Sequence, residues 1–302
     1  MRLNGIYVAM LTPLDENGKI KEDELRKLTR FYIEKEVDGL FVVSSVGEKI
    51  YLPEDEVARG FSIVADENKG KMKLFANITS TNAIDAISLG RVAEKLNYDA
   101  VVSAPPYYYN LTEKIVYNYY NTITENLNVP LIIYNIPIFA FPLSSNLIDR
   151  LSKNPKVLAI KDSSGNMVEF MHNYEIIKEN NPNLNIMIGR DEIFLHALIS
   201  GADSCMLGAA GIVPEVFIKI YELFKENKLK EAMILQRSIL KLLRICFKPA
   251  FPNGFKLALE QRGFNMGYSK RVPSEEDKKL MLELKPIILD EINKILELVK
   301  SI

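Results

Sequence analysis

Short, uninterrupted apolar runs recur at nearly even intervals along the chain. They are rich in valine, isoleucine and leucine, and they cover residues 6–10, 40–43, 73–77, 100–103, 131–134, 157–160, 185–188 and 204–207. Runs of this length without polar alternation are typical of strands that are buried on both faces. The pattern therefore predicts eight buried strands.

Amphipathic stretches separate these runs. Leu25, Leu28, Phe31 and Tyr32 form one apolar helical face, and the same spacing recurs around residues 86–96. Strands that alternate with helices indicate a parallel sheet. Eight units without a compositional break, and without the glycine-rich GxGxxG turn, favour an α/β fold with a closed (β/α)8 TIM barrel over an open doubly wound sheet.

After the eighth unit the apolar spacing stays helical. It predicts helices over residues 229–247 and 255–262, and a last helix that carries Leu280, Leu284, Ile287, Ile288, Ile292, Ile295 and Val299. We therefore expect a (β/α)8 catalytic domain over residues 1–225 and a C-terminal helical extension over residues 226–302.

Composition narrows the possible partners and the location. The net charge is −1 with both signs mixed along the chain, so the basic surface that nucleic-acid binding needs is not expected. No stretch has the length of a membrane span, and the N-terminus lacks a cleavage pattern. Cys205 and Cys246 lie in apolar segments without CxxC spacing, which indicates reduced core thiols and a cytoplasmic protein.

Chemistry is expected at the ends of the strands, where barrels of this type place their catalytic residues. Lys161 follows the sixth run and Tyr134 ends the fifth, so an amine and a phenol can meet above the core. A partly desolvated lysine loses proton affinity and becomes a nucleophile toward carbonyl groups. A solvated lysine at the strand end is the plain alternative. His172 and His196 lack metal-ligand spacing, so we expect no metal site.

Two loops add further candidates. Residues 44–47, Ser-Ser-Val-Gly, offer hydroxyls and closely spaced backbone N–H groups that suit an anion, although an ordinary βα turn has the same composition. The run APPYYYN carries Tyr107, Tyr108 and Tyr109, and three adjacent aromatic residues also suit packing or an interface.

Several motifs in one order resemble a known family. They are LTPLDENGKI, GLFVVSSVGE, SAPPYYYN, VPLIIYNIP, VLAIKDSSGN, IGRDEIF, GADSCMLGAAG and FPNGFKLALEQRGF. The chain is similar to the N-acetylneuraminate lyase and dihydrodipicolinate synthase family of class I aldolases, which includes the 2-keto-3-deoxygluconate aldolases. The resemblance implies pyruvate and an aldehyde as small-molecule partners, and a lysine imine in place of a metal or organic cofactor.

The resemblance also assigns roles. Lys161 is the imine-forming lysine, Tyr134 is the acid/base group, and Ser45 with one tyrosine of residues 107–109 completes a proton relay. Tyr108 is favoured, with Tyr107 or Tyr109 open as a register shift. This tyrosine reaches the neighbouring subunit in the family, which implies a homotetramer built from two tight dimers.

The substrate-binding residues follow in the same way. The turn with Val46 and Gly47 holds the carboxylate, and Met206 packs beside pyruvate or belongs to the barrel core. Four further residues match contacts to the polyol tail of sialic acids: Ser163, Gly189, Asp191 and Glu192. Asp191 and Glu192 also suit the start of a helix for purely structural reasons.

Three differences from the family pattern bear on which substrate is expected. Ile138 and Phe139 stand where dihydrodipicolinate synthases hold an arginine that grips a carboxylate, which disfavours aspartate semialdehyde. Val46 replaces a hydroxyl residue, and Ala209 replaces a serine of the sialic acid lyases.

The sequence therefore predicts an aldolase that cleaves a 2-keto-3-deoxy sugar acid of the 2-keto-3-deoxygluconate type to pyruvate and an aldehyde. N-acetylneuraminate lyase, sugar-acid dehydratase and, less favoured, dihydrodipicolinate synthase stay as enzyme alternatives. A pyruvate-binding regulatory barrel is the non-enzyme alternative, and Val46 is the feature that supports it.

Overall fold

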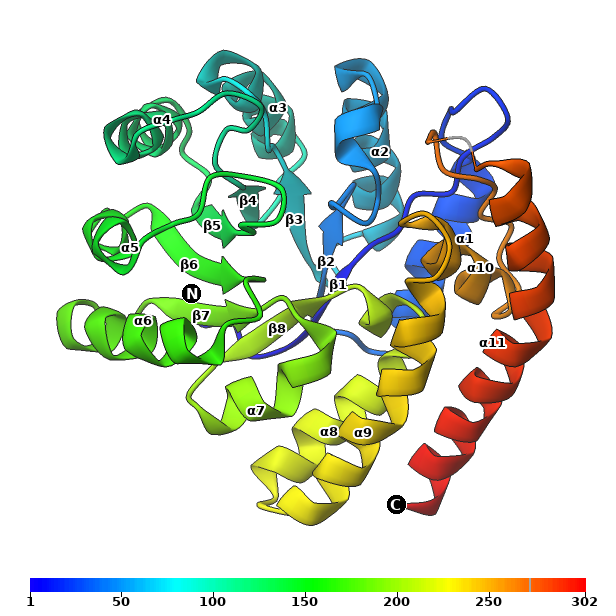
Figure 1. The fold of residues 1–302 in the computed structure, drawn as a ribbon. Coiled ribbons are helices and arrows are strands. Elements are labelled where there is room, and N and C mark those ends of the chain that lie inside the picture. The colour runs from blue at the N-terminus through cyan, green and yellow to red at the C-terminus, as the bar shows by residue number, and fades with distance from the viewer. Residues whose placement is uncertain (272) are drawn as a thin grey trace.

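A computed structural model describes residues 1–271 and 273–302 of the chain. Eight parallel strands close a barrel in the order in which they occur along the chain (Figure 1). They are β1 (Gly5–Ala9), β2 (Gly39–Val42), β3 (Lys73–Asn77), β4 (Ala100–Ser103), β5 (Leu131–Asn135), β6 (Val157–Asp162), β7 (Asn185–Ile188) and β8 (Ser204–Leu207). The predicted TIM barrel is confirmed.

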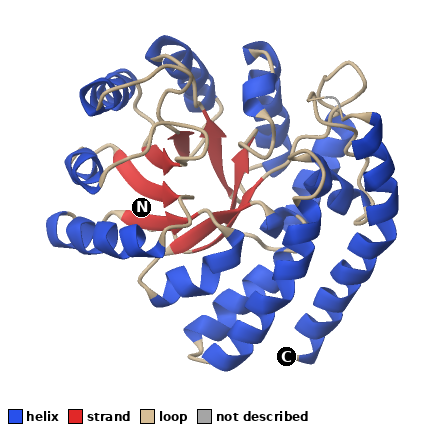
Figure 2. Ribbon diagram, viewed as in Figure 1, coloured by secondary structure: helices blue, strands red, loops and turns tan. Residues whose placement is uncertain are grey.

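Helices surround the strands and form the outer layer of the barrel (Figure 2). They are α1 (Glu22–Glu34), α2 (Glu54–Asn68), α3 (Ala83–Lys95), α4 (Glu113–Asn126), α5 (Ser145–Ser152), α6 (Met167–Asn180), α7 (Phe194–Ile199) and α8 (Pro214–Lys225). Several of these helices have an N-cap side chain that accepts hydrogen bonds from backbone N–H groups of the first turn. These N-cap residues are Asn82, Thr112, Ser144 and Asn166. Short 3-10 turns lie at Lys49–Tyr51, Asp191–Ile193 and Ala209–Gly211.

Strand β6 runs past the predicted apolar run and includes Lys161 and Asp162. In the register of the sheet, Lys161 is paired with Tyr134 of β5 on one side and with Met187 of β7 on the other. The lysine therefore belongs to a rigid strand and not to the loop that follows it.

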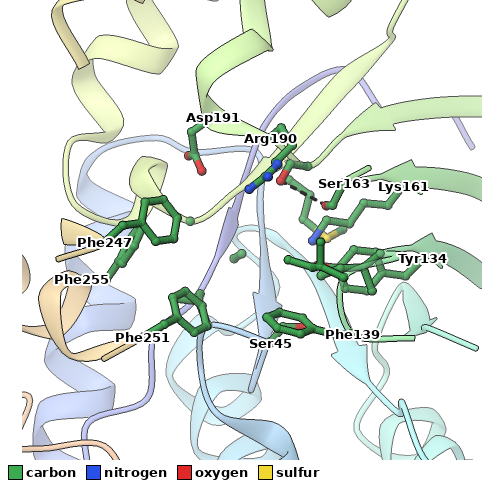
Figure 3. Close-up of a pocket in the computed structure, with 17 residues that line it drawn as sticks. Ser45, Tyr134, Phe139, Lys161, Ser163, Arg190, Asp191, Phe247, Phe251 and Phe255 are labelled. Carbon is green, nitrogen blue, oxygen red and sulfur yellow. Dashed lines mark hydrogen bonds between the residues drawn. The ribbon is translucent and has the colours of Figure 1, made fainter. Parts of the chain in front are cut away.

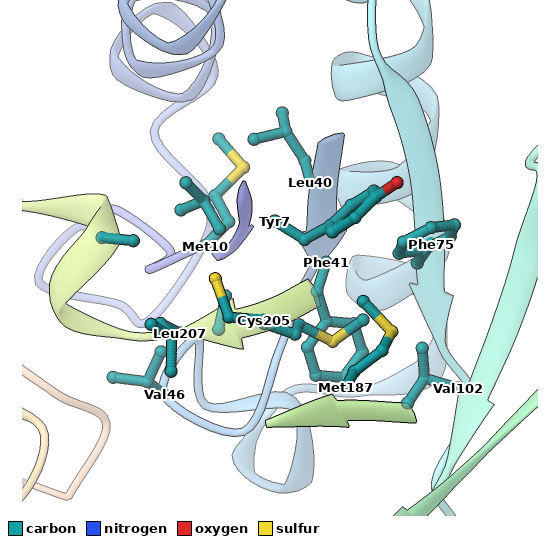
Figure 4. Close-up of a cluster of buried hydrophobic side chains, with 14 of the residues drawn as sticks. Tyr7, Met10, Leu40, Phe41, Val46, Phe75, Val102, Met187, Cys205 and Leu207 are labelled. Carbon is teal, nitrogen blue, oxygen red and sulfur yellow. The ribbon is translucent and has the colours of Figure 1, made fainter. Parts of the chain in front are cut away.

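The barrel interior is filled by large side chains from several strands (Figure 4). Tyr7, Phe41, Phe75 and Met187 are fully buried there, whereas Cys205 is buried on the opposite face of β8, since it pairs with Ile6 while Met206 pairs with Tyr7. Cys205 and Cys246 are both free and buried, as predicted. The packed interior leaves the carboxyl ends of the strands as the place where a small molecule can bind.

The C-terminal extension consists of α9 (Leu229–Cys246), α10 (Asn253–Glu260) and α11 (Glu275–Ser301). Helix α9 packs against α8 and α11, so the extension lies along one side of the barrel (Figure 1). The division of the chain into two domains at residue 225 stays a prediction. None of the helices in the described residues is long and apolar enough to span a membrane.

Candidate active site

Lys161 and Tyr134 meet at the carboxyl ends of neighbouring strands. Lys161 is only 2% exposed, and its Nζ lies 4.0 Å from the centre of the Tyr134 ring and 4.9 Å from the centre of the Phe41 ring. The amine is thus enclosed by aromatic faces, which is a largely apolar environment for a group that carries charge in water.

No carboxylate in the described part of the chain forms an ion pair with Lys161, although the equally buried Lys256 pairs with Glu48. Burial lowers the pKa of Lys161 below its ordinary value, and the nearby Tyr134 and Asp191 groups oppose this shift. Desolvation disfavours the ammonium form, so the fraction of neutral, nucleophilic amine is raised.

Gly189 allows the chain after β7 to approach the lysine closely. A Cβ atom at this position would lie 2.0 Å from Ser163 Oγ and 2.7 Å from Lys161 Cε. The Gly189 N–H donates to the Asp162 carbonyl at 2.7 Å, and the Ser163 hydroxyl donates to the Gly189 carbonyl at 3.1 Å. Only glycine fits between these two side chains without displacing them.

The turn after β2 lies at the same end of the barrel. The Ser44 hydroxyl donates to the Met10 carbonyl at 2.9 Å and accepts the Gly47 N–H at 3.1 Å. Gly47 therefore shapes the turn, and its N–H is already used. The backbone N–H groups of Ser45 and Val46 have no protein acceptor among the described residues, so they stay available to an anion.

Asp191 is buried at the start of the turn after β7. One carboxylate oxygen accepts the Ala209 N–H at 2.8 Å, and Gln236 of α9 holds the backbone by donating to the Asp191 carbonyl at 3.0 Å. Burial, together with the neighbouring charge of Glu192, raises the pKa of Asp191 to about 7. This carboxyl group can therefore change its protonation state near neutral pH.

Most of these groups line one cavity, which Figure 3 shows in close-up. Of the residues predicted from the sequence, the structure brings eight to this cavity: Ser45, Val46, Tyr134, Lys161, Ser163, Gly189, Asp191 and Met206. Polar groups at and just beyond the ends of β6 and β7 lie on one side, and phenylalanine rings close the other. The cavity is therefore amphipathic.

Three predicted residues do not line it. Gly47 belongs to the turn but not to the cavity wall, and Glu192 is also absent from that wall. Tyr108 is 87% exposed, and its φ is +86°. Tyr107 instead lines an adjacent cavity that shares Ser45, Phe139 and other wall residues with the first.

Sequence reasoning missed several wall residues, among them Arg190, Phe247, Phe251 and Phe255. Arg190 lies between two residues that were singled out, so its place at a strand end was a usable signal. The phenylalanines recur every four residues, but Phe247 follows α9, Phe251 lies between α9 and α10, and Phe255 belongs to α10, so they do not share one helix. Nothing in their spacing shows that all three rings reach the barrel mouth.

A lysine that is buried beside a tyrosine at the ends of parallel barrel strands, with no acidic partner among the described residues, provides the groups that imine chemistry uses. No cluster of three or more potential metal ligands occurs in residues 1–271 and 273–302. Residues 2–289 match the model of the Dihydrodipicolinate synthetase family, and the chain belongs to this family. Its members are pyruvate-dependent class I aldolases of the lyase class.

Relatives within the family match this chain over almost its full length. The N-acetylneuraminate lyase of Pasteurella multocida is 32% identical over 276 residues, which are 91% of this chain and 93% of that protein. The crystal structure of CdNal from Clostridium difficile in complex with mannosamine is 30% identical, with a TM-score of 0.87 over 95% of this chain and 100% of that one. A catalytic lysine mutant of Ruminococcus gnavus sialic acid aldolase is 27% identical, with a TM-score of 0.88 over 98% and 100%.

Proposed function

We propose that this protein cleaves a 2-keto-3-deoxy sugar acid, of the 2-keto-3-deoxygluconate type, into pyruvate and an aldehyde. The observation that carries the proposal is the buried Lys161 amine, which has no acidic partner in residues 1–271 and 273–302 and lies 4.0 Å from the centre of the Tyr134 ring. The catalytic lysine of the sialic acid aldolase relative supports a lysine in this role.

The reaction begins when the neutral Lys161 amine attacks the C2 carbonyl carbon of the keto acid and forms a carbinolamine. Tyr134 donates its hydroxyl proton as the C2 oxygen leaves as water, which gives a protonated imine. The resulting Tyr134 phenolate then removes the proton of the C4 hydroxyl. The C3–C4 bond breaks, its electrons move into the imine, and the aldehyde departs.

An enamine of pyruvate stays attached to Lys161. Protonation of its C3 carbon restores the imine, and water hydrolyses the imine to release pyruvate and the free amine. The lysine itself supplies the electron sink, so the proposed cycle uses no metal and no organic cofactor.

The carboxylate of the keto acid would bind the turn after β2. The free N–H groups of Ser45 and Val46 provide two donors, which are the kind of contact that anions form with backbone turns. Val46 offers no side-chain hydroxyl, so the carboxylate depends on the backbone donors and the Ser45 hydroxyl. Met206 would pack against the methyl end of pyruvate.

Tyr108 would complete the proton relay from a neighbouring subunit. Its exposed side chain and its positive φ are unfavourable in an isolated chain, because a tyrosine in this backbone region is strained by about 1–3 kcal/mol. Insertion of Tyr108 into the site of a second copy would bury the exposed side chain and give the strained backbone a function. We therefore propose a tight dimer. A homotetramer of two such dimers is the assembly that the family resemblance implies.

The walls of the cavity favour a short polyol tail. Ser163, Arg190 and Asp191 provide polar contacts on one side, whereas Phe139, Phe251 and two further phenylalanines provide none. Glu192 lies outside the cavity wall, and Ala209 carries no hydroxyl. A three-carbon aldehyde such as glyceraldehyde needs only the polar side.

N-acetylneuraminate is the second candidate substrate. The P. multocida relative carries the name N-acetylneuraminate lyase, and CdNal was crystallised with mannosamine. Gly189 and Asp191 are both present in the cavity wall for its polyol tail. The phenylalanine side would then lie against the less polar edge of the sugar.

Pyruvate release from a panel of keto-deoxy acids tests the proposal, with Lys161→Ala as the control. The proposal expects release from 2-keto-3-deoxygluconate above that from N-acetylneuraminate, and a pyruvate-derived mass on the Lys161 peptide after borohydride treatment. Release mainly from N-acetylneuraminate would favour the second candidate. A dehydrated keto acid without pyruvate would indicate a dehydratase, and an adduct or stabilisation by pyruvate without any turnover would indicate a regulatory barrel.

A further inference from the structure

A buried ion pair outside the cavity joins the C-terminal extension to the turn that carries Ser45 and Val46. Lys256 of α10 lies with its Nζ 2.7 Å from Oε1 of Glu48, and both side chains are at most 1% exposed. Glu48 directly follows the turn in sequence. Two charges that are buried this deeply lose their hydration, which costs free energy. The presence of such a pair at this position therefore calls for an explanation.

Glu48 contacts two segments from the C-terminal part of the chain, which are α10 and residues 269–270. Its Oε2 accepts hydrogen bonds from the Ser269 hydroxyl and from the Lys270 N–H, the latter at 3.0 Å. Lys256 also donates to the Tyr268 carbonyl at 3.2 Å. The carboxylate is thereby fixed in direction as well as in position.

The backbone of Glu48 is hydrogen-bonded to the turn. Its N–H donates to the Ser45 carbonyl at 3.2 Å, and its φ is +66°, in the left-handed region that residues with a Cβ avoid. A strained residue of this kind stays in place only where its surroundings hold it. Here the surroundings are the contacts of its own carboxylate.

A path of direct contacts therefore leads from α10, through Lys256 and Glu48, to the Ser45 carbonyl and the two free N–H groups. A hydrophobic pair of similar volume would connect the two elements at least as stably, but without fixing their orientation. The directional pair suits a turn whose donors must point at one small anion.

We propose that Glu48 and Lys256 are positioning residues that set the affinity of the site for the carboxylate of its keto acid, by holding the turn of Ser45 and Val46 at the cavity. This inference rests on the proposed function, because it assumes that the carboxylate binds this turn. Neither residue lines the cavity with Lys161.

The test compares two ketones that form the same imine. Pyruvate carries the carboxylate, whereas methyl pyruvate carries an uncharged ester in its place. For each ketone, the rate of borohydride trapping on the Lys161 peptide is measured against ketone concentration by mass spectrometry. This gives a half-saturating concentration and a limiting rate, and thermal unfolding shows that each variant is folded at the assay temperature.

In Glu48→Gln and Lys256→Met we expect the half-saturating pyruvate concentration to rise roughly tenfold, as for the loss of one hydrogen bond to a charged group. In Ser269→Ala, which leaves the ion pair intact, we expect a rise of about threefold. The limiting rate should change little, and half-saturation with methyl pyruvate should not change. Because Ser269→Ala introduces no unpaired charge, it decides the question if the charge variants do not fold.

Glu291→Gln is the matched control. Glu291 of α11 is also buried and pairs with Lys241 of α9 at 2.5 Å, but it does not contact the turn. Pyruvate half-saturation should equal that of the unmodified protein. Unchanged pyruvate half-saturation in the folded Glu48 and Ser269 variants, or equal shifts for both ketones, would overturn the inference. Failure of the proposed function is separate, because the unmodified protein would then form no adduct on Lys161.

Discussion

At the scale of single residues, Gly189 controls how the lysine is placed. Gly189→Ala would put a methyl group 2.7 Å from Lys161 Cε and 2.0 Å from Ser163 Oγ, so both side chains must move. Because a shift of about 1 Å in a reacting group can cost about a hundredfold in rate, we expect borohydride trapping of pyruvate to slow by about that factor.

Gly208→Ala is the control for this substitution. Gly208 lines the same cavity, but a Cβ atom there would meet its nearest neighbour, in Phe255, at an ordinary 3.7 Å. This variant should trap pyruvate at nearly the original rate. Equal losses in the two variants would mean that general crowding of the cavity, and not displacement of Lys161, causes the effect.

Asp191 makes stability depend on pH. Its pKa is raised from 3.8 to about 7 in the folded protein, chiefly by burial. Between these two values the folded state keeps a proton that the unfolded state has lost, so stability falls as the pH rises through this interval and stays lower above it. Asp191→Asn removes this titration and keeps an acceptor for the Ala209 N–H.

We therefore expect Asp191→Asn to have a higher thermal unfolding temperature than the original protein at pH 8, with the difference shrinking toward pH 5. Unfolding temperatures of both proteins across this range measure the effect. The same variant should release less pyruvate from polyhydroxylated substrates, since an amide accepts fewer hydrogen bonds than a carboxylate. A difference that does not vary with pH would show that Asp191 is ionised throughout.

At the scale of elements, the strands were predictable because strands buried on both faces leave continuous apolar runs. Lys161 was expected at the end of the sixth strand, but β6 also includes Asp162, a polar residue that joins the strand through pairing with β5 and β7. Local sequence does not contain that pairing. The lysine and tyrosine could still be chosen, because neighbouring strands of a parallel barrel end at a common edge.

The extension illustrates the opposite case. Its helices were predictable from their spacing, but its contacts with the site were not. Phe251 and Phe255 reach the cavity, Gln236 holds the turn that carries Asp191, and Lys256 holds the turn that carries Ser45. These contacts join residues far apart in sequence, and a periodic pattern defines a helical face without defining what that face meets.

At the scale of the whole molecule, the tyrosine proposed for the relay does not line the cavity of its own chain. Tyr108 is 87% exposed, and it lines a surface cavity with Tyr109 and with Phe139, which is also in the wall of the Lys161 cavity, so exposed aromatic side chains lie beside that cavity. In a symmetric dimer the same patch is used by both copies, and each would insert Tyr108 toward the Lys161 of the other. Activity would then belong to the dimer.

Mixing two inactive variants tests this arrangement. Lys161→Ala removes the amine, and Tyr108→Phe removes the relay hydroxyl. If the tyrosine acts across the interface, a mixed dimer holds one damaged site with neither group and one intact site that combines Lys161 of one chain with Tyr108 of the other. Random mixing makes half of the dimers mixed, so we expect about a quarter of the original pyruvate-releasing activity.

The outcome separates three arrangements. If Tyr108 serves its own chain, every site in the mixture lacks one group, and activity stays at the sum of the two variants alone. If Tyr109 carries the relay instead, Tyr108→Phe is nearly active by itself, and the same mixing experiment with Tyr109→Phe should restore activity. Because each variant is measured alone and then after joint refolding, recovered activity can come only from a site that two chains build together.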